Sequence, residues 1–478
     1  MAQIRSLLPL LCATLIAAYA IPRSVFATDS PNGDLKLVVA LFRHGVRAPL
    51  ETFGKNAGRH SENAWPDLKK DWHVCPTCWG YLTPHGSNAV RILGSYYGNY
   101  YSKNAWPNKF SVYLWADVDQ RTKATAEALR DGMQSAGADV KVEYLQPSGG
   151  TDPLFHPFDA NCGEPDTKRL ETIATYINDN APGWIREFTS PTRGDQLNDL
   201  YSILACNDIK HCQPLSQITD HATAWSPPTA TPTPRPPLPI NWAGQFSYAS
   251  SATEAFLLEY ANGLDIEKVG WGNVIDKKTG STDTLSKLLQ LHEFYFEKTE
   301  RGLNHAAPDL YLAGIQGSNL VREIRDQLNK IVQKPSLGDC PRPSGQSQFV
   351  GLVGHDTNLA NVQTLLNVNW NFDDAQLPPD MRELPANDAL PAGALVFELR
   401  QTSPSDYSVR IQYVTQSLNQ IRNAPQQADP FRVKTTCGDG KESPCEMSLR
   451  NFNKLVTNAI QNYKPFLSRC QDGKQVCP

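Results

Sequence analysis

Three apolar runs with β-branched or aromatic residues lie along the chain, and each is followed by a polar loop. The runs are Leu35–Phe42, Phe110–Ala116 and Phe349–Val353, and their composition is typical of buried strands. After each loop comes a stretch with helical apolar spacing; these stretches are His85–Tyr97, Thr122–Met133 and Asp356–Leu366. The repetition predicts an α/β sheet whose ligands bind beyond the carboxyl ends of the strands.

The middle of the chain has helical character. Thr167–Leu204 and Ser251–Thr299 are predicted to be mostly helical, as at Thr253–Asn262 and Leu285–Lys298. Between them, Ser226–Pro239 is rich in Pro and Thr, which excludes a helix or a central strand and predicts an extended, polyproline-like loop. We interpret it as a long loop within a helical insertion rather than an interdomain linker, because both flanks have the same character.

Strand character returns near the C-terminus. Gly393–Leu399 and Tyr407–Val414 alternate in polarity and are predicted to pair as neighbours. We therefore expect one α/β catalytic domain built from residues 28–165 and 300–478. Residues 166–299 are expected to form an inserted α-helical cap domain, with its Pro-rich loop at 226–239.

The N-terminus has the pattern of a secretory signal. Arg5 supplies the positive charge, Leu7–Ala20 a short apolar run, and Val25 and Ala27 the small residues of a cleavage site. The run is too short for a permanent membrane anchor. We expect residues 1–27 to be removed, giving a periplasmic or extracellular protein with no membrane attachment.

The cysteine count agrees with export. Cys12 is one of eleven cysteines and leaves with the signal peptide, so ten remain, enough for up to five disulfides. Cys206 with Cys212, and Cys437 with Cys445, are close enough in sequence to form small loops. The Cys75 to Cys78 pair would suit a redox or zinc protein, but no second pair or βαβ context accompanies it, so we expect structural disulfide bonding there.

Charge and histidine spacing bear on the partners and ligands to be expected. The chain has 478 residues and a formal net charge of −4 without long runs of one sign, which argues against nucleic acid or anionic membranes. No pair of histidines has the spacing of a metal motif, so no metal or other cofactor is expected. Seven histidines are interpreted as structural or exposed: His60, His73, His85, His156, His211, His221 and His305.

The first motif with clear chemistry is Arg43–Pro49, Arg-His-Gly-Val-Arg-Ala-Pro, directly after a predicted strand. A phosphate dianion needs fixed donors, and the forked guanidinium groups of Arg43 and Arg47 supply them. Gly45 lets the backbone approach a ligand closely. Neighbouring arginines disfavour an imidazolium, so they lower the pKa of His44 and keep it nucleophilic.

Two further motifs follow strands. Asp356 is suited to protonate a leaving alcohol oxygen, and His355 beside it is suited to hold a phosphate oxygen. In Asp117–Thr122, Arg121 offers another cationic fork at the start of a helix, a favourable place for an anion.

These motifs resemble those of the histidine acid phosphatases, especially the bacterial periplasmic phytase and glucose-1-phosphatase group. Arg-His-Gly-x-Arg-x-Pro matches Arg43–Pro49, and His-Asp matches His355 and Asp356. The likeness extends from about Leu35 to Cys445. Further similar stretches are Tyr81–Gly86, Ala116–Thr122, Asp152–Phe155, Thr253–Phe256 and Gly354–Asn361.

The resemblance implies a fold and a set of roles. The fold is an α/β sandwich like that of phosphoglycerate mutase, with an added α-helical domain. His44 is implied as the nucleophile and Asp356 as the proton donor. The implied phosphate ligands are Arg43, Arg47, Arg121 and His355, and the substrate-facing side chains are Glu254 and His292. We expect a monomer that hydrolyses small phosphate esters through a phosphohistidine, at acid pH and without metal.

One departure bears on the substrate. Phytase-like members carry Thr-Lys after the motif's proline, whereas Leu50 and Glu51 stand here, and Leu50 resembles the glucose-1-phosphatase pattern. A carboxylate in place of a cation should disfavour a substrate with many phosphates. Nearby cations that would compensate are Lys55, Arg59, Lys69 and Lys70. Phytate and sugar phosphates therefore both remain open.

Three other classes of protein share some of these features. A phosphoglycerate-mutase-like transferase shares Arg-His-Gly but would lack an export signal and disulfides. A non-catalytic phosphate-binding protein of the same fold would keep the arginines yet tolerate loss of His44 or Asp356. A redox or zinc protein built on Cys75 and Cys78 is the third.

Overall fold

The computed structural model describes residues 33–51, 61, 63–107, 110–145, 151–160, 162–191, 195–205, 245–299, 310–332, 345–438, 444–467, 469–471 and 474–476. The predicted signal peptide and the Pro-rich loop at 226–239 lie outside these residues. So do Cys206, Cys212, Lys55 and Arg59.

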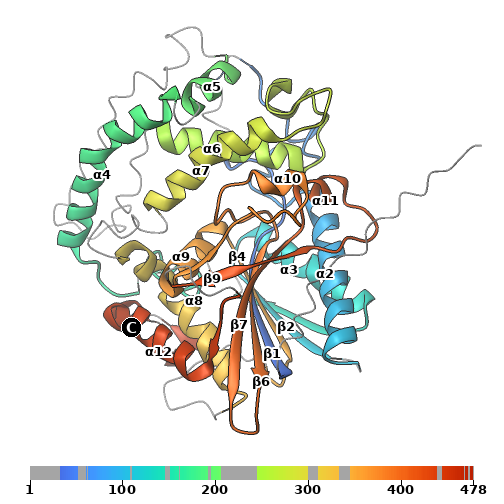
Figure 1. The fold of residues 1–478 in the computed structure, drawn as a ribbon, viewed down its shortest axis with the longest axis vertical. Coiled ribbons are helices and arrows are strands. Elements are labelled where there is room, and N and C mark those ends of the chain that lie inside the picture. The colour runs from blue at the N-terminus through green and yellow to red at the C-terminus, as the bar shows by residue number, and fades with distance from the viewer. Residues whose placement is uncertain are drawn as a thin grey trace, which may run out of the picture.

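A mixed sheet forms the centre of the molecule (Figure 1). From edge to edge its strands are β10 (Glu446–Ser448), β7 (Tyr407–Thr415), β6 (Ala394–Gln401), β1 (Asp34–Arg43), β4 (Phe349–Gly354), β2 (Ser111–Ala116) and β3 (Asp139–Tyr144), and β8 (Phe431–Val433) pairs with β7. The half from β1 to β3 is parallel, whereas β6, β7 and β10 run antiparallel. The predicted pairing of the two C-terminal strands is confirmed.

The register aligns the carboxyl ends of three parallel strands. β1 pairs with β4 up to Arg43 and Gly354, and the last residue of β2 lies opposite Val353. The backbone N–H of His44 donates to the Gly354 carbonyl over 2.9 Å. The three polar motifs therefore leave the sheet at one edge, as the sequence predicts.

Both faces of the sheet are covered, and β1 shows why its sequence is apolar throughout. Leu37, Val39 and Leu41 belong to one hydrophobic cluster, while Val38 and Phe42 belong to another on the opposite face. The helices on the Val38 face are α2 (Pro84–Asn104) and α3 (Gln120–Ser135). Those packed on the other face are α8 (Tyr311–Asn329), α9 (Asp356–Leu366) and α12 (Leu449–Ile460).

The helical segment that follows β3 and ends before α8 lies in the upper part and along the left side of Figure 1. It contains α4 (Thr167–Phe188), α5 (Gln196–Ile203), α6 (Gln245–Ala261), the short 3₁₀ helix η4 (Val269–Gly272) and α7 (Asp283–Thr299). Phe256 and Leu288 belong to the same hydrophobic cluster as Leu41 and Leu352 of the sheet. The segment thus shares the core of the sheet, and the domain limits at 166 and 299 stay a prediction.

The remaining described elements are small. They are β5 (Val368–Trp370) paired with β9 (Thr435–Cys437), β11 (Arg469–Gln471) paired with β12 (Lys474–Val476), α10 (Pro379–Arg382), α11 (Leu418–Asn423) and the 3₁₀ helix η5 (Gln461–Phe466). Cys75 is bonded to Cys78 and Cys437 to Cys445, in agreement with structural disulfide bonding at both places. In the part of the chain described here, every helix is too short or too polar to cross a bilayer.

Candidate active site

His44 stands at the end of β1 with its ring orientation fixed. Its side chain is buried, and its Nδ1 lies 2.8 Å from the carbonyl oxygen of Gly45. A carbonyl only accepts, so this contact favours the tautomer with a proton on Nδ1 and a lone pair on Nε2. A Cβ on Gly45 would come within 2.6 Å of Val90 on α2, so this glycine is required by packing as well.

The surroundings of His44 keep its ring neutral. Burial is the main cause that holds the pKa of His44 well below its usual value, and the charges of Arg121 and Arg43 lower it further. The sequence pointed to the arginines alone, and burial is the larger cause. A neutral ring with a free Nε2 is the form that can attack phosphorus.

Arg43 and Arg47 meet on one carboxylate from the helical segment. Nη2 of Arg43 lies 2.5 Å from Oε1 of Glu254, and Nη2 of Arg47 lies 2.8 Å from Oε2. Burial by itself raises the pKa of Glu254, but the two guanidinium groups outweigh it and the pKa is lowered. In the absence of a ligand, Glu254 therefore neutralises the two guanidinium groups that are predicted to bind a phosphate dianion.

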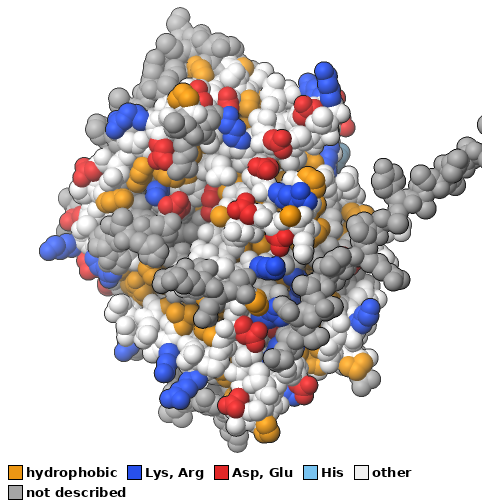
Figure 2. Space-filling model, in the orientation of Figure 1, with side chains coloured by type: hydrophobic (Ala, Val, Ile, Leu, Met, Phe, Trp, Pro, Cys, Tyr) orange, Lys and Arg blue, Asp and Glu red, His pale blue; other side chains and the backbone are white. Residues whose placement is uncertain are grey.

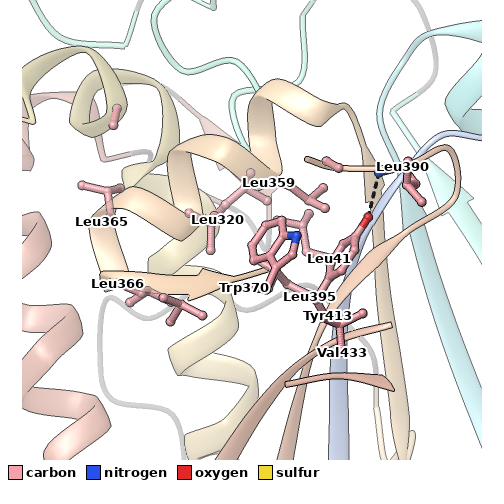
Figure 3. Packing of buried hydrophobic residues seen from close by; sticks show 14 of the residues in the cluster. Leu41, Leu320, Leu359, Leu365, Leu366, Trp370, Leu390, Leu395, Tyr413 and Val433 are labelled. Atoms are coloured by element: carbon pink, nitrogen blue, oxygen red, sulfur yellow. Dashed lines mark hydrogen bonds between the residues drawn. The ribbon is translucent and has the colours of Figure 1, made fainter. Parts of the chain in front are cut away.

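Arg43 is also held from behind by the loop between α10 and β6. Its Nη1 donates to the carbonyl of Ala389 over 2.6 Å. That loop is tied down where the Leu390 N–H donates to the Tyr413 hydroxyl over 2.7 Å, the dashed line in Figure 3. Tyr413 in turn stacks on Trp370 with ring centroids 4.5 Å apart. The buried core thus fixes the guanidinium in place.

Asp356 opens α9 beside these groups. Its Oδ2 lies 2.7 Å from Nη2 of Arg43, and its Oδ1 accepts the N–H of Thr357 over 2.9 Å. Burial raises the pKa of Asp356, but positive charges nearby, above all that of Arg43, outweigh it, so the pKa lies well below the usual range. Without a ligand Asp356 is an ionised partner of Arg43, and it can act as an acid only if a phosphate takes that guanidinium over.

On the other side of His44, Arg121 and His355 face each other. Nη2 of Arg121 lies 3.3 Å from Nδ1 of His355 and 2.8 Å from a carboxylate oxygen of Asp119. The rings of His355 and His44 are 5.5 Å apart. Both predicted phosphate ligands thus lie at the site, as do Arg43 and Arg47.

Sequence reasoning missed two residues behind His355. Oδ2 of Asp117 lies 2.8 Å from Nε2 of His355 and 2.9 Å from Nε2 of His156. Asp117 directly follows β2, which was a signal, but it was noted only as part of the Arg121 motif. His156 was interpreted as structural or exposed, and no spacing in the sequence linked it to the site.

The residues expected to face the substrate lie at two places. His292 on α7 is buried, with Nδ1 2.9 Å from the Ser250 hydroxyl, and it has a ring nitrogen within 4.8 Å of carboxylate oxygens of Glu254 and Asp356. Leu50 is 37% exposed. Leu50 and Arg121 both lie within 4 Å of the point where a Cβ on Gly80 would stand, so Leu50 lies near one of the predicted phosphate ligands.

Glu51 follows Leu50 on the surface and is exposed. Its place in the chain, one residue after Leu50, makes it a candidate for sensing charge on the rest of a substrate. Its contribution to specificity remains a prediction.

Two groups of side chains have the spacing of metal ligands. Asp117, His156 and His355 form the first group, but both imidazoles already donate to the carboxylate. The second group is Glu254, His292 and Asp356, and its carboxylates are paired with arginines, which would repel a metal cation. Hydrogen bonds and ion pairs account for both clusters.

The site has a neutral histidine ringed by arginines at the carboxyl edge of parallel strands, and this is the arrangement of a phosphatase that acts through histidine. The model of the histidine phosphatase superfamily (branch 2) matches residues 34–414, so the chain belongs to this family. It is an enzyme of the histidine acid phosphatase type, a phosphoric monoester hydrolase.

Individual phytases and glucose-1-phosphatases are similar to this chain over most of its length. Phytase AppA of Escherichia coli K12 is 28% identical over 450 residues, 92% of this chain and 95% of that protein. Glucose-1-phosphatase of Salmonella typhimurium is 26% identical over 429 residues, 87% of this chain and 89% of that protein. The structure of Hafnia alvei phytase in complex with tartrate superimposes with a TM-score of 0.66 at 25% identity, covering 90% of this chain and 98% of that one.

Glu254→Gln is expected to make the fold depend on phosphate. The change removes the carboxylate that pairs with Arg47 and leaves Arg43 with Asp356, at a cost of about 3 kcal/mol without ligand. Inorganic phosphate would restore the balance, so it should raise the thermal midpoint of the variant more than that of the wild type. Thermal unfolding with and without phosphate measures both effects.

Glu259→Gln is the matched control on the same helix. Glu259 is buried and accepts the N–H of Gly270, and burial raises its pKa to about 8, so it carries no charge at acid pH. Its replacement should leave the phosphate effect as in the wild type. Equal phosphate effects in Glu254→Gln and the wild type would contradict the role of Glu254 as the counter-charge.

Proposed function

We propose that the enzyme hydrolyses small phosphomonoesters in two steps, with His44 as the nucleophile and Asp356 as the proton donor. The observation that supports this most strongly is the contact of His44 Nδ1 with the Gly45 carbonyl, because it leaves Nε2 unprotonated and available. Arg43, Arg47 and Arg121 stand around the ring as donors for the phosphate oxygens.

In the first step the phosphate group takes the arginines from Glu254 and Asp356. The dianion now beside Asp356 raises the pKa of that carboxyl, so it holds a proton at acid pH. Nε2 of His44 forms a bond to phosphorus as the ester P–O bond breaks, and Asp356 protonates the leaving oxygen. The cations spread around the site stabilise the charge on the transferring group.

In the second step water takes the place of the alcohol. Asp356, now ionised, accepts a proton from the water as its oxygen attacks phosphorus, and the N–P bond breaks with the electron pair returning to His44. Inorganic phosphate leaves, and Glu254 pairs again with Arg43 and Arg47. The net reaction consumes one water and regenerates every group.

A sugar phosphatase with little activity on phytate is the second candidate, and Glu51 is the observation that favours it. Relatives include both a phytase and glucose-1-phosphatases, so the comparisons leave the substrate open. An exposed carboxylate at this position repels the additional phosphates of phytate but not a sugar ring. Lys69 and Lys70 are both exposed cations, and they would attract the additional phosphates.

The experiment is a substrate panel at acid pH in the presence of a chelator. We expect hydrolysis of an aryl phosphate and of glucose 1-phosphate without added metal. Glu51→Lys should raise kcat/KM for phytate about tenfold relative to the aryl phosphate, with Glu51→Gln in between. A purely alkaline optimum or a strict need for a divalent metal would contradict the proposed chemistry, and unchanged ratios would remove Glu51 from it.

We also infer an exported monomer that does not bind nucleic acid. Figure 2 supports the last point, because Lys and Arg side chains are interspersed with Asp and Glu on the face shown. Disulfides within the described residues agree with export.

A further inference from the structure

Behind the phosphate ligands, two histidines share one carboxylate oxygen. Nε2 of His355 and Nε2 of His156 lie 2.8 Å and 2.9 Å from Oδ2 of Asp117, and the two rings are 5.3 Å apart. Oδ1 of Asp117 is buried and makes no hydrogen bond within the described part of the chain. Both imidazoles therefore interact with the same negative charge, that of Asp117.

The position of His156 is built into the fold. The side chain of Asn358 accepts the backbone N–H of His355 over 2.9 Å and donates to the carbonyl of Phe155, also over 2.9 Å. Asp152 accepts the N–H of Leu154 over 2.9 Å and so fixes the turn that carries His156. The Asn358 side chain thus bridges the backbone at His355 to the backbone next to His156, in addition to the link through Asp117.

The two ring nitrogens of His355 have different tasks. Nε2 donates to Asp117, and Nδ1 lies 3.3 Å from a donor nitrogen of Arg121, so a neutral ring accepts there. Only the imidazolium has a proton on Nδ1 to give to a phosphate oxygen. Phosphate binding through His355 therefore depends on whether that ring is charged.

Several groups set the charge of His355. Burial lowers the pKa of His355 most, the charges of Arg121 and His156 lower it further, and Asp117 alone does not restore it. Oδ2 of Asp119 also lies 3.4 Å from Nε2 of His355, and the His44 ring is 5.5 Å away.

The pKa of His156 is shifted in the opposite direction to that of His355. Burial opposes its charge, but the hydrogen bond and charge of Asp117 outweigh burial and raise the pKa of His156, and Asp159 and Asp119 add to this. Nδ1 of His156 lies 4.0 Å from a carboxylate oxygen of Asp159, which is exposed. His156 is consequently a cation at acid pH, next to the ring it influences.

We propose that His156 is a positioning residue: as a cation it competes with His355 for Asp117, and so confines phosphate binding through His355 to acid pH. The inference rests on the proposed function, because it needs an oxyanion bound at the His44 site. It assigns His156 no contact with the substrate.

The test is the pH dependence of sulfate binding, measured by calorimetry on the full mature protein between pH 4 and 8. Sulfate stays a dianion across this range, so changes in affinity report on the protein. In His156→Gln, which keeps an amide donor without the charge, the midpoint of the loss of affinity should move upward by about one pH unit. Asp159→Asn, at the exposed partner of His156, should give a smaller shift in the same direction.

His85→Gln is the matched control, because His85 is partly buried and its Nε2 lies 2.8 Å from a backbone carbonyl, that of Ile421. Its sulfate curve should coincide with that of the wild type. Curves of His156→Gln and Asp159→Asn that superimpose on the wild type would overturn the inference, even with a lower thermal midpoint, since His156 would then be merely structural. Absence of sulfate and phosphate binding by the wild type at every pH would instead contradict the proposed function.

Discussion

Replacing His44 by alanine is expected to lower kcat/KM for an aryl phosphate by at least about 10⁴-fold. Removal of the imidazole leaves no atom to form the bond to phosphorus, while Arg43, Arg47 and Arg121 remain to bind the substrate. Inorganic phosphate should therefore still bind the variant. Steady-state rates and phosphate calorimetry on the same preparation separate the two effects.

His73→Ala is the control for this change, because His73 is an exposed histidine outside the site. It should keep the wild-type rate. A His44→Ala variant that binds phosphate and hydrolyses the ester at the wild-type rate would contradict the nucleophilic role.

The second large effect is expected for Asp356→Asn, and its size should depend on the leaving group. An amide cannot supply the proton, so hydrolysis of an alkyl phosphate should slow by about 10²- to 10⁴-fold. An ester of 4-nitrophenol, whose oxygen leaves without help, should slow less in the first step. Comparing the two substrates in burst and steady-state experiments isolates proton donation from phosphate binding.

The pH dependence of the wild type follows from the same carboxyl. Once phosphate has taken over Arg43, the pKa of Asp356 rises from its lowered value, and activity is lost as the pH rises through it. The acid optimum should therefore disappear from the alkyl phosphate profile in Asp356→Asn. An equal loss for both esters at all pH values would assign Asp356 a binding role only.

The sequence predicted the central layer of the fold because buried parallel strands leave a clear pattern. The ends of β1, β2 and β4 differ from those of the predicted runs by at most one residue. β3 was missed, since it is an edge strand with Asp139 and Lys141 exposed and lacks a continuous apolar run. α8 and α12 were missed as well, and their place on the sheet depends on packing against residues distant in sequence.

The residues of the candidate site also differ in how far the sequence predicts them. Residues directly after strands, such as His44 and Asp356, were found because the ends of parallel strands meet at one edge. Glu254 and His292 come from the helical segment, and only the family resemblance pointed to them. His156 had no signal, because its link to His355 passes through Asp117 and exists only in three dimensions. Likewise, a backbone carbonyl such as that of Ala389 leaves no trace in the sequence.

The most direct measurement is to quench the enzyme during turnover of a ³²P-labelled ester and map the label by mass spectrometry under alkaline conditions, where phosphohistidine survives. One phosphoryl group is expected on the peptide that contains His44, and none on this peptide in His44→Ala. A larger labelled fraction is also expected in Asp356→Asn with the nitrophenyl ester, because the water step is slowed. Label on another residue, or turnover with no labelled protein at any time, would contradict the nucleophilic role of His44.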